Sequence, residues 1–199
     1  ELVPVQALFL RERRIRPALV TARAVWRWLD VRAIYDDYAL EVVDGYDAVL
    51  PAPVDVRWRT AGIDARGAFD LGGDVTLLPR IAYRWEKPWQ VTDPDFTELY
   101  YDVTNEQLKG RLALQWDTFV GPSVVVGAEG AVEHGRVDDF SVTDPGTGEP
   151  LLSYAGEPSI TYTWVAGFVE AEYDSRWANL LAGARLEDHS GFGTAFVPR

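Results

Sequence analysis

Apolar and polar side chains alternate along this chain over about eight stretches of nine to fifteen residues. The stretch from 109 to 119 is typical, because Leu112 and Leu114 fall on one face while Arg111 and Gln115 fall on the other. A period of two is that of a β-strand, whose successive side chains point to opposite faces of a sheet. We therefore predict an all-β, antiparallel up-and-down protein.

The connections between these stretches alternate between short and long. Strands are predicted at 18–26, 31–40, 57–69, 74–86, 109–119, 124–137, 160–174 and 179–188. Short joins fall at 27–30, 70–74, 120–123 and 175–178, and roughly twenty residues separate the other strand pairs. Transmembrane β-barrels of the outer-membrane type have short periplasmic turns and longer extracellular loops. The spacing therefore predicts a transmembrane β-barrel segment of about eight strands.

The two faces of the predicted strands differ as lipid and water require. In the stretch 124–137, Val124, Val126 and Val132 share one face, and Glu129 and Glu133 lie on the other. Aromatic residues are plentiful near the predicted strand ends, as in the aromatic girdles at the two membrane interfaces. They include Trp26, Trp28, Trp58, Tyr83, Trp85, Trp89, Tyr100, Tyr101, Tyr162, Trp164, Tyr173 and Trp177. Aromatic side chains packed in the core of a soluble β-sandwich are the alternative interpretation.

Composition excludes several classes of protein. No stretch approaches the eighteen or so uncharged apolar residues that a transmembrane helix requires. The formal net charge of −12 argues against a nucleic-acid partner, because binding a polyanion needs clustered Lys and Arg. The absence of Cys excludes a disulfide framework and a thiolate site. The chain opens at Glu1 without a leader and contains no Met, so we expect both ends to lie inside a larger protein.

The last forty residues carry a resemblance to a known family. The stretch 164–173 is followed by a short turn, then by 181–193, and closes in 196–199; these read WVAGFVEAEY, LAGARLEDHSGFG and FVPR. A Gly-x-Arg-x-acidic strand, then His-Ser, Phe-Gly and a Pro-Arg that opens the next strand, resembles the β-barrel of a TonB-dependent outer-membrane receptor. The alternation in 180–189 independently assigns Arg185 and Glu187 to the wet face and Leu186 to the lipid face.

The resemblance implies a 22-stranded barrel plugged by a globular domain in the bacterial outer membrane. Residues 1–199 are then a partial receptor-like β-barrel domain, with the plug domain and the C-terminal strands outside it. The implied function is ligand-gated active import of a scarce nutrient, such as an iron-siderophore complex or cobalamin, using TonB-derived energy. The implied partners are outer-membrane lipid, the protein's own plug domain, the TonB complex acting through the plug, and a small-molecule ligand such as a metal chelate. No cofactor is expected.

Two groups of candidate site residues follow. Ligand contacts are expected where long loops meet the upper lumen, because aromatic rings stack on a planar chelate and Arg meets its carboxylates. These ligand-binding candidates are Arg84, Trp89, Phe96, Tyr100, Tyr101, Arg136 and Tyr154. A second group is expected to contact the plug or line the wet path through the lumen, and it comprises Arg80, Arg111, Glu129, Arg185 and Glu187.

Other interpretations of the same residues remain open. Eight strands also suit a small closed outer-membrane barrel with a structural or adhesive role. Asp188, His189 and Ser190 are adjacent, but neighbours in an extended chain point to opposite faces, so polar capping of a strand end is favoured over a catalytic triad. No Asp-rich segment has the spacing of a calcium loop, and turn formation explains them better. We therefore expect no catalytic and no metal-binding residues.

Overall fold

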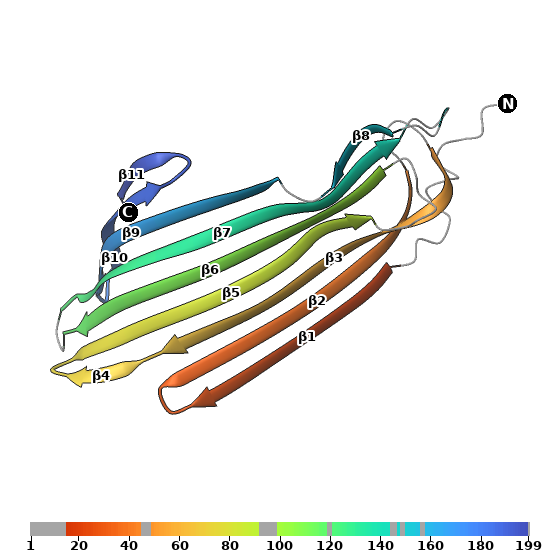
Figure 1. Cartoon of the computed structure of the whole chain (residues 1–199). Helices are drawn as coiled ribbons and strands as arrows, with labels where there is room; N and C mark the ends of the chain where they lie inside the picture. Colours follow the sequence, from red (N-terminus) through yellow and green to blue (C-terminus); the bar gives the residue numbers. More distant parts are fainter. Residues whose placement is uncertain are drawn as a thin grey trace.

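A computed structural model of the chain describes residues 15–44, 49–91, 99–118, 121–143, 147, 150–155 and 158–198. All of the strands in these ranges join one antiparallel sheet (Figure 1). They are β1 (Ile15–Trp26), β2 (Leu29–Asp44), β3 (Val49–Gly67), β4 (Phe69–Gly72), β5 (Val75–Val91), β6 (Leu99–Asp117), β7 (Ser123–Thr143), β8 (Pro150–Ala155), β9 (Ser159–Asp174), β10 (Asn179–His189) and β11 (Gly193–Pro198).

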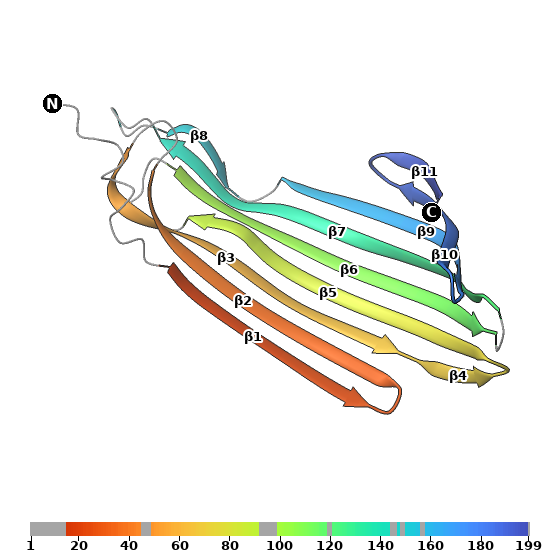
Figure 2. The ribbon, with the colours of Figure 1, turned by 180° about the vertical axis from the view of Figure 1, so that it is seen from behind.

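The sheet is an up-and-down meander. Its order is β1-β2-β3-β5-β6-β7-β9-β10-β11, with β4 added beside β5 and β8 beside β7. Figure 2 shows the same succession from behind, with β1 at one edge and with β10 and β11 turned out of the line of the long strands. Within the described residues β1 and β11 do not pair with each other, so the sheet is all-β and antiparallel as predicted but is not closed into a barrel.

The predicted strands are present, and several extend further than predicted. The short turns predicted at 27–30, 70–74 and 175–178 lie between paired strands as predicted, and the one predicted at 120–123 falls partly outside the described residues. At the second of them Gly72, Gly73 and Asp74 all adopt positive φ, which glycine tolerates best. The segments predicted as loops of about twenty residues are in large part strand, because β2, β3, β5, β6 and β7 continue beyond their predicted ends and β8 adds a hairpin. Alternation in those segments is weak, so the pattern alone ended the strands too early.

Neighbouring strands are staggered in one direction. A row of directly opposite residues runs across the sheet and comprises Asp30, Arg66, Arg80, Arg111, Glu129, Ala166 and Glu187. Asp30 lies one residue from Leu29, the start of β2, whereas Glu187 lies eight residues from Asn179, the start of β10. The row therefore moves seven residues along the strands over six steps from strand to strand. The stagger is thus about one residue per strand, which corresponds to a strand tilt of about 40° for standard strand geometry. Transmembrane barrels have tilts in this range.

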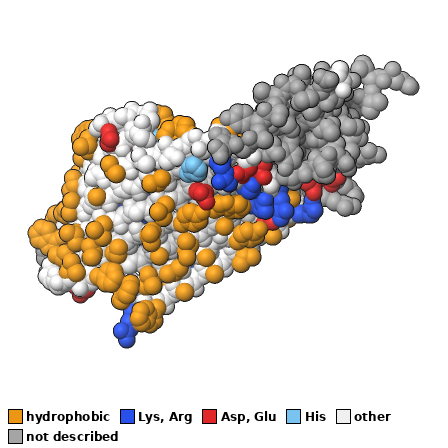
Figure 3. Space-filling view, viewed as in Figure 1, with side chains coloured by type: hydrophobic (Ala, Val, Ile, Leu, Met, Phe, Trp, Pro, Cys, Tyr) orange, Lys and Arg blue, Asp and Glu red, His pale blue; other side chains and the backbone are white. Residues whose placement is uncertain are grey.

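The sheet has one apolar face. The outer face, defined by Leu112, Val126 and Leu186, carries large hydrophobic side chains that are exposed, and Figure 3 shows them spread over the molecule. They are Val20, Trp26, Tyr35, Ile63, Ile81, Tyr83, Leu108, Leu112, Leu114, Trp116, Val126, Val132, Val165, Val169, Tyr173, Leu180, Leu186 and Phe196. We call this set the apolar band. Exposure of so much contiguous apolar surface marks a face that contacts something other than water.

Aromatic side chains lie at both limits of the apolar band. Trp26, Trp116 and Tyr173 are exposed at the ends near the short turns, and Tyr35 and Tyr83 are exposed towards the other ends of their strands. Between these limits the described residues of the outer face are uncharged, except for Asp188, which lies next to the turn at 190–192. At standard strand rise and the tilt above, the band is about 20 to 25 Å tall, close to the height of a transmembrane barrel's apolar band.

Candidate functional site

Charged side chains gather on the inner face of the sheet, opposite the apolar band. The staggered row that contains Arg66, Arg80, Arg111, Glu129 and Glu187 lies on this face, so neighbouring strands present charges side by side. The five residues predicted to face the lumen are therefore brought together on one face, Arg185 being two residues from Glu187 on β10. We call this set, with Asp64 and Lys109, the inner charged ladder.

Ion pairs in the ladder cross from strand to strand. Arg185 on β10 hydrogen-bonds Glu129 on β7, and its Nε lies 2.9 Å from Glu187 Oε2. Lys109 Nζ on β6 lies 3.5 Å from the other carboxylate oxygen of Glu129. Only 9% of the Glu129 side chain is exposed, so its charge is held almost entirely by these two cations. Ala166 lies between Glu129 and Glu187 in the register, and its small side chain leaves room for the contact.

A second group of pairs holds the other end of the ladder. The Arg66 and Arg80 guanidiniums both donate to Asp64, with Nε to oxygen distances of 3.0 Å in each case. Arg66 and Asp64 are on β3, and Arg80 is on β5, so the carboxylate links two strands. One carboxylate shared by two guanidiniums leaves donors of both free for contact with a further anion, because each guanidinium has five N–H groups.

Arg111 is held by an aromatic ring instead of a carboxylate. Its guanidinium carbon lies 4.5 Å from the centre of the Phe168 ring on β9, two strands away. The ring reaches across β7 at Gly127, where a Cβ atom would lie 2.6 Å from Phe168 Cζ and 2.7 Å from the Leu112 carbonyl oxygen. Gly127 is therefore the residue that lets Phe168 support Arg111. Among the described residues no ion pair of Arg111 is present, so its donors can meet an external anion.

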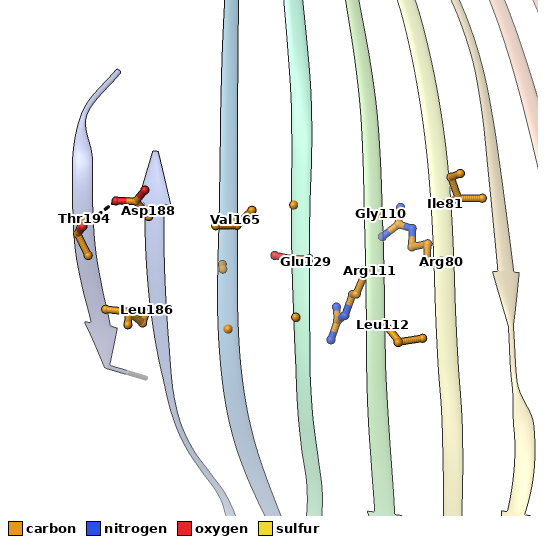
Figure 4. A pocket seen from close by; sticks show the side chains of 14 residues that line it. Arg80, Ile81, Gly110, Arg111, Leu112, Glu129, Val165, Leu186, Asp188 and Thr194 are labelled. Carbon is orange, nitrogen blue, oxygen red and sulfur yellow. Dashed lines mark hydrogen bonds between the residues drawn. The ribbon is translucent and has the colours of Figure 1, made fainter. Parts of the chain in front are cut away.

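Glycine and alanine leave a shallow hollow at the same level of the sheet, on the outer face, behind the ladder. The hollow measures about 760 Å³ and is lined by residues that include Gly110, Gly130 and Gly167. Figure 4 shows Arg80, Arg111 and Glu129 on adjoining strands beside it, and the hydrogen bond from Thr194 Oγ1 to Asp188 Oδ1, 2.7 Å long, at its edge. Added Cβ atoms at Gly110 and Gly167 would meet nothing within 4 Å, so the hollow is open.

Arg84 also lies on the inner face, towards the longer connections. It pairs with Glu86 on the same strand and lines a groove of about 260 Å³ together with Gln107 and Glu133. Gln107 Nε2 donates to Glu133 Oε1 at 2.7 Å. In this groove Arg84, a predicted ligand-binding residue, lies beside other polar groups of the inner face.

The remaining ligand-binding candidates are placed less fully. Phe96 lies outside the described residues. Trp89 belongs to β5, and Tyr100 and Tyr101 belong to β6. Tyr154 belongs to β8, where it lies opposite Phe140 of β7. The structure describes the backbone of these four residues and not their side chains. Their segments are strand, whereas the sequence predicted loops.

Arg136 does not join Arg84. It is on β7 opposite Thr104, in the register of the outer face, and its Nε donates to Asp138 at 2.6 Å. The sequence could have placed Arg136 on the outer face, because it lies an even number of residues from Val126 and Val132 in the same strand.

Asp188, His189 and Ser190 form separate hydrogen bonds and none with one another in the described structure. His189 Nδ1 accepts from the Gly191 N–H at 2.9 Å, and Ser190 Oγ accepts from the Thr163 N–H at 3.0 Å. Each of the three side chains thus fixes the turn between β10 and β11 or its neighbour strand, in agreement with the capping interpretation.

Several inner-face residues were missed by the sequence analysis. Asp64, Arg66, Lys109 and Phe168 belong to the ladder or support it, and further towards β1 Asp30 receives hydrogen bonds from Arg23 and Arg32. Residues an even number of positions apart in a strand share a face, so counting along each strand would have placed all of them on the inner face. The same face also bears exposed apolar side chains, among them Leu19, Val25, Ile34, Leu181 and Val197.

Comparisons with family models, with curated proteins and with solved structures gave no match. Within the described ranges no helix is long and apolar enough to cross a membrane. The same ranges contain no group of three or more His, Cys, Asp or Glu side chains placed to hold a metal ion.

Proposed function

We propose that this chain forms part of the wall of a transmembrane β-barrel in the bacterial outer membrane. The observation that carries the proposal is the contrast between the two faces of one tilted sheet. An apolar band with aromatic limits and Asp188 as its charged exception suits the hydrocarbon layer, and an ion-paired inner face suits a water-filled or plugged lumen. Open sheet edges are not stable in lipid, so β1 and β11 pair with further strands in the complete barrel.

The barrel is proposed to belong to a ligand-gated active transporter of the TonB-dependent receptor type. The support is the segment 164–199, whose described residues, 164–198, lie in three successive strands, β9, β10 and β11, and the two tight turns that join them. In this proposal the inner charged ladder contacts the protein's own plug domain, and Arg84 with its groove lies on the path of a small-molecule ligand such as a metal chelate. TonB-derived energy then drives import through the plug.

The polarity of the strands gives the orientation. The short turns at 27–28, 73–74 and 175–178 share one end of the sheet. The longer connections, 92–98 and 144–149, lie at the other end, where the strands also extend well beyond the apolar band and where the tight turn at 190–192 joins β10 to β11. Short turns face the periplasm in bacterial outer-membrane barrels, so the end with Arg84 and Arg136 faces outwards.

Fractionation and intact mass of the natural gene product test the proposal. We expect the protein in the outer-membrane fraction at a mass several times the 22.3 kDa of this chain. A mass near that of this chain in the same fraction would favour a small closed barrel and remove active import, and recovery in a soluble fraction would contradict the membrane assignment altogether. For import itself, uptake of a labelled iron chelate should be lost in cells without the gene and in wild-type cells treated with a protonophore.

A further inference from the structure

A second group of charged side chains lies on the outer face, beyond the apolar band. It begins two residues beyond Tyr35 on β2 and four residues beyond Tyr83 on β5, towards the longer connections. Its cations are Arg16, Arg57, Arg59, Lys87 and Arg136, and its carboxylates are Asp37, Asp55, Asp102 and Asp138. We call this set the outer charged belt. Figure 3 shows basic and acidic side chains side by side at this limit of the apolar surface.

Two β-bulges build the centre of the belt. The register between β5 and β6 shifts between Glu86 and Gln90, and that between β6 and β7 shifts at Asp102, so that Asp138 is an extra residue. As a result Lys87 Nζ lies 2.5 Å from Asp102 Oδ1 and 3.2 Å from Asp138 Oδ2, across two strand boundaries. Bulges are known to re-aim side chains in this way.

The carboxylates of the belt lie deeper than most of its guanidiniums. Exposed fractions are 15% for Asp37, 13% for Asp102 and 21% for Asp138, against 46% for Arg57 and 50% for Arg136. Asp55 is the exception, since it is nearly as exposed as its partner Arg16. The acids therefore hold the arginines from beneath, and the surface presented outwards is largely cationic.

The outward arginines use only some of their hydrogen-bond donors in contacts with the described residues. Arg57 uses Nε, 2.7 Å from Asp37 Oδ1, and Nη2 on the same carboxylate, and Arg136 uses Nε on Asp138. Among the described residues no partner is present for the other N–H groups of these two side chains. A guanidinium with free N–H groups matches the oxygens of a phosphate group.

We propose that the outer charged belt binds phosphate groups of lipid headgroups in the leaflet on the side of the longer connections. The belt begins roughly 5 to 10 Å beyond the aromatic limit of the apolar band at standard strand rise, which is headgroup depth. It is continuous with the lipid-facing surface and extends over β1, β2, β3, β5, β6 and β7, as a row of separate headgroups would. The inference rests on the proposed membrane location of this sheet and adds a ligand class to it.

The test uses the full natural chain in vesicles of phosphatidylcholine and phosphatidic acid in equal amounts. After extraction in mild detergent, native mass spectrometry counts the phosphatidic acid retained relative to phosphatidylcholine. The variants are Arg57→Gln, Arg136→Gln and the double substitution. Arg66→Gln is the matched control, because Arg66 is on the same strand as Arg57, is exposed to 45% against 46%, and lies on the inner face.

We expect the retained ratio to fall about five-fold for each belt arginine removed, as the usual contribution of a basic residue near an anionic membrane surface implies. Arg57→Lys should keep most of the retention, and Arg66→Gln should leave it unchanged. Equal retention by wild type and the double variant would overturn the inference. Loss of retention on adding inorganic phosphate at the concentration of the lipid phosphate would assign the site to free phosphate and overturn the lipid assignment.

Flotation of the vesicles reports insertion separately from lipid binding. A wild-type chain that does not float with the vesicles would contradict the proposed function and this inference together. A chain that floats but shows no dependence on Arg57 and Arg136 contradicts this inference alone. If Arg57→Gln does not insert because Asp37 loses its partner, Arg136→Gln alone decides, since its partner Asp138 keeps Lys87 and Thr104.

Discussion

Arg185 on β10 hydrogen-bonds Glu129 on β7, although β9 lies between them in the sheet. The contact passes over Ala166, so it depends on a small residue in the intervening strand. It ties three strands together on the inner face and buries most of the Glu129 carboxylate.

Removing one partner of this pair should destabilise the folded barrel. We expect Arg185→Gln to lower the free energy of unfolding in lipid vesicles by about 1 to 3 kcal/mol, because Glu129 is left buried with Lys109 as its remaining cation. Arg32→Gln is the control, since Arg32 pairs with Asp30 at 2.9 Å in an exposed position and such pairs contribute roughly 0 to 1 kcal/mol. Urea titrations compare the two, and a larger loss for Arg32→Gln would contradict the role of the Glu129 pair.

Gly127 should tolerate no side chain. In Gly127→Ala the new Cβ meets the Leu112 carbonyl oxygen and the Phe168 ring, so the strands must shift and Arg111 loses its support. Overpacking of this kind costs about 1 to 3 kcal/mol. Gly167→Ala is the matched control, because nothing lies within 4 Å of its added Cβ, and we expect it to be neutral or slightly stabilising. Equal urea midpoints for the two variants would contradict this prediction, because they would show that the strands around Gly127 accommodate a Cβ atom without loss of stability.

The face assignment predicts opposite outcomes for neighbouring residues of β6. Leu114→Arg introduces a charge into the apolar band, and its cost rises to about 2 to 4 kcal/mol for a site at the bilayer midplane. Gln115→Arg places the same charge on the inner face, where polar and charged groups are already present. Refolding yield into vesicles, read from heat-modifiable mobility on gels, should fall for Leu114→Arg alone. A fall for Gln115→Arg alone would invert the assignment of the faces.

The belt carboxylate Asp138 predicts a dependence on acidic pH. Burial raises the pKa of Asp138, but hydrogen bonds from Thr104 and Arg136 and the nearby Lys87 outweigh burial and lower its pKa to about 2. A folded-state pKa below the unfolded value, about 3.9, gives a stabilisation that is complete above about pH 4 and is lost as the pH falls towards 2.

The check is the urea midpoint of wild type and of Asp138→Asn between pH 2 and pH 6. We expect the difference in urea midpoint between wild type and Asp138→Asn to be constant above pH 5 and to become smaller as the pH falls below 4. If the difference in urea midpoint grew on acidification, ionised Asp138 would not stabilise the folded protein and the prediction would be wrong.

Alternation identified the strands and their faces for a local reason. Successive residues of a strand point to opposite sides, so parity alone assigns Leu112 and Val126 to one face and Arg111 and Glu129 to the other. The short joins were found as breaks between two periodic runs, and at 70–74 and 120–123 Gly, Pro or Asp supported the prediction of a turn. The segments beyond the apolar band were predicted as loops, because apolar and polar residues do not alternate regularly there.

The contacts of the candidate site could not be predicted in this way. Which cation meets Glu129 depends on the register of β6, β7, β9 and β10, and register is a relation between distant segments. The outer belt depends on bulges, which change the parity of the residues that follow them, so Lys87, Asp102 and Asp138 could not be placed together by counting.

The sequence by itself determined that the chain forms long antiparallel strands with one apolar face and one charged face, since both properties follow from the two-residue period. The tertiary structure alone decided the stagger of about one residue per strand, the pairing of Arg185 with Glu129, and the gathering of the belt around Lys87. The physical reason is that hydrogen-bonded pairing and bulges set how far one strand slides along the next, and many slides are compatible with the same local alternation.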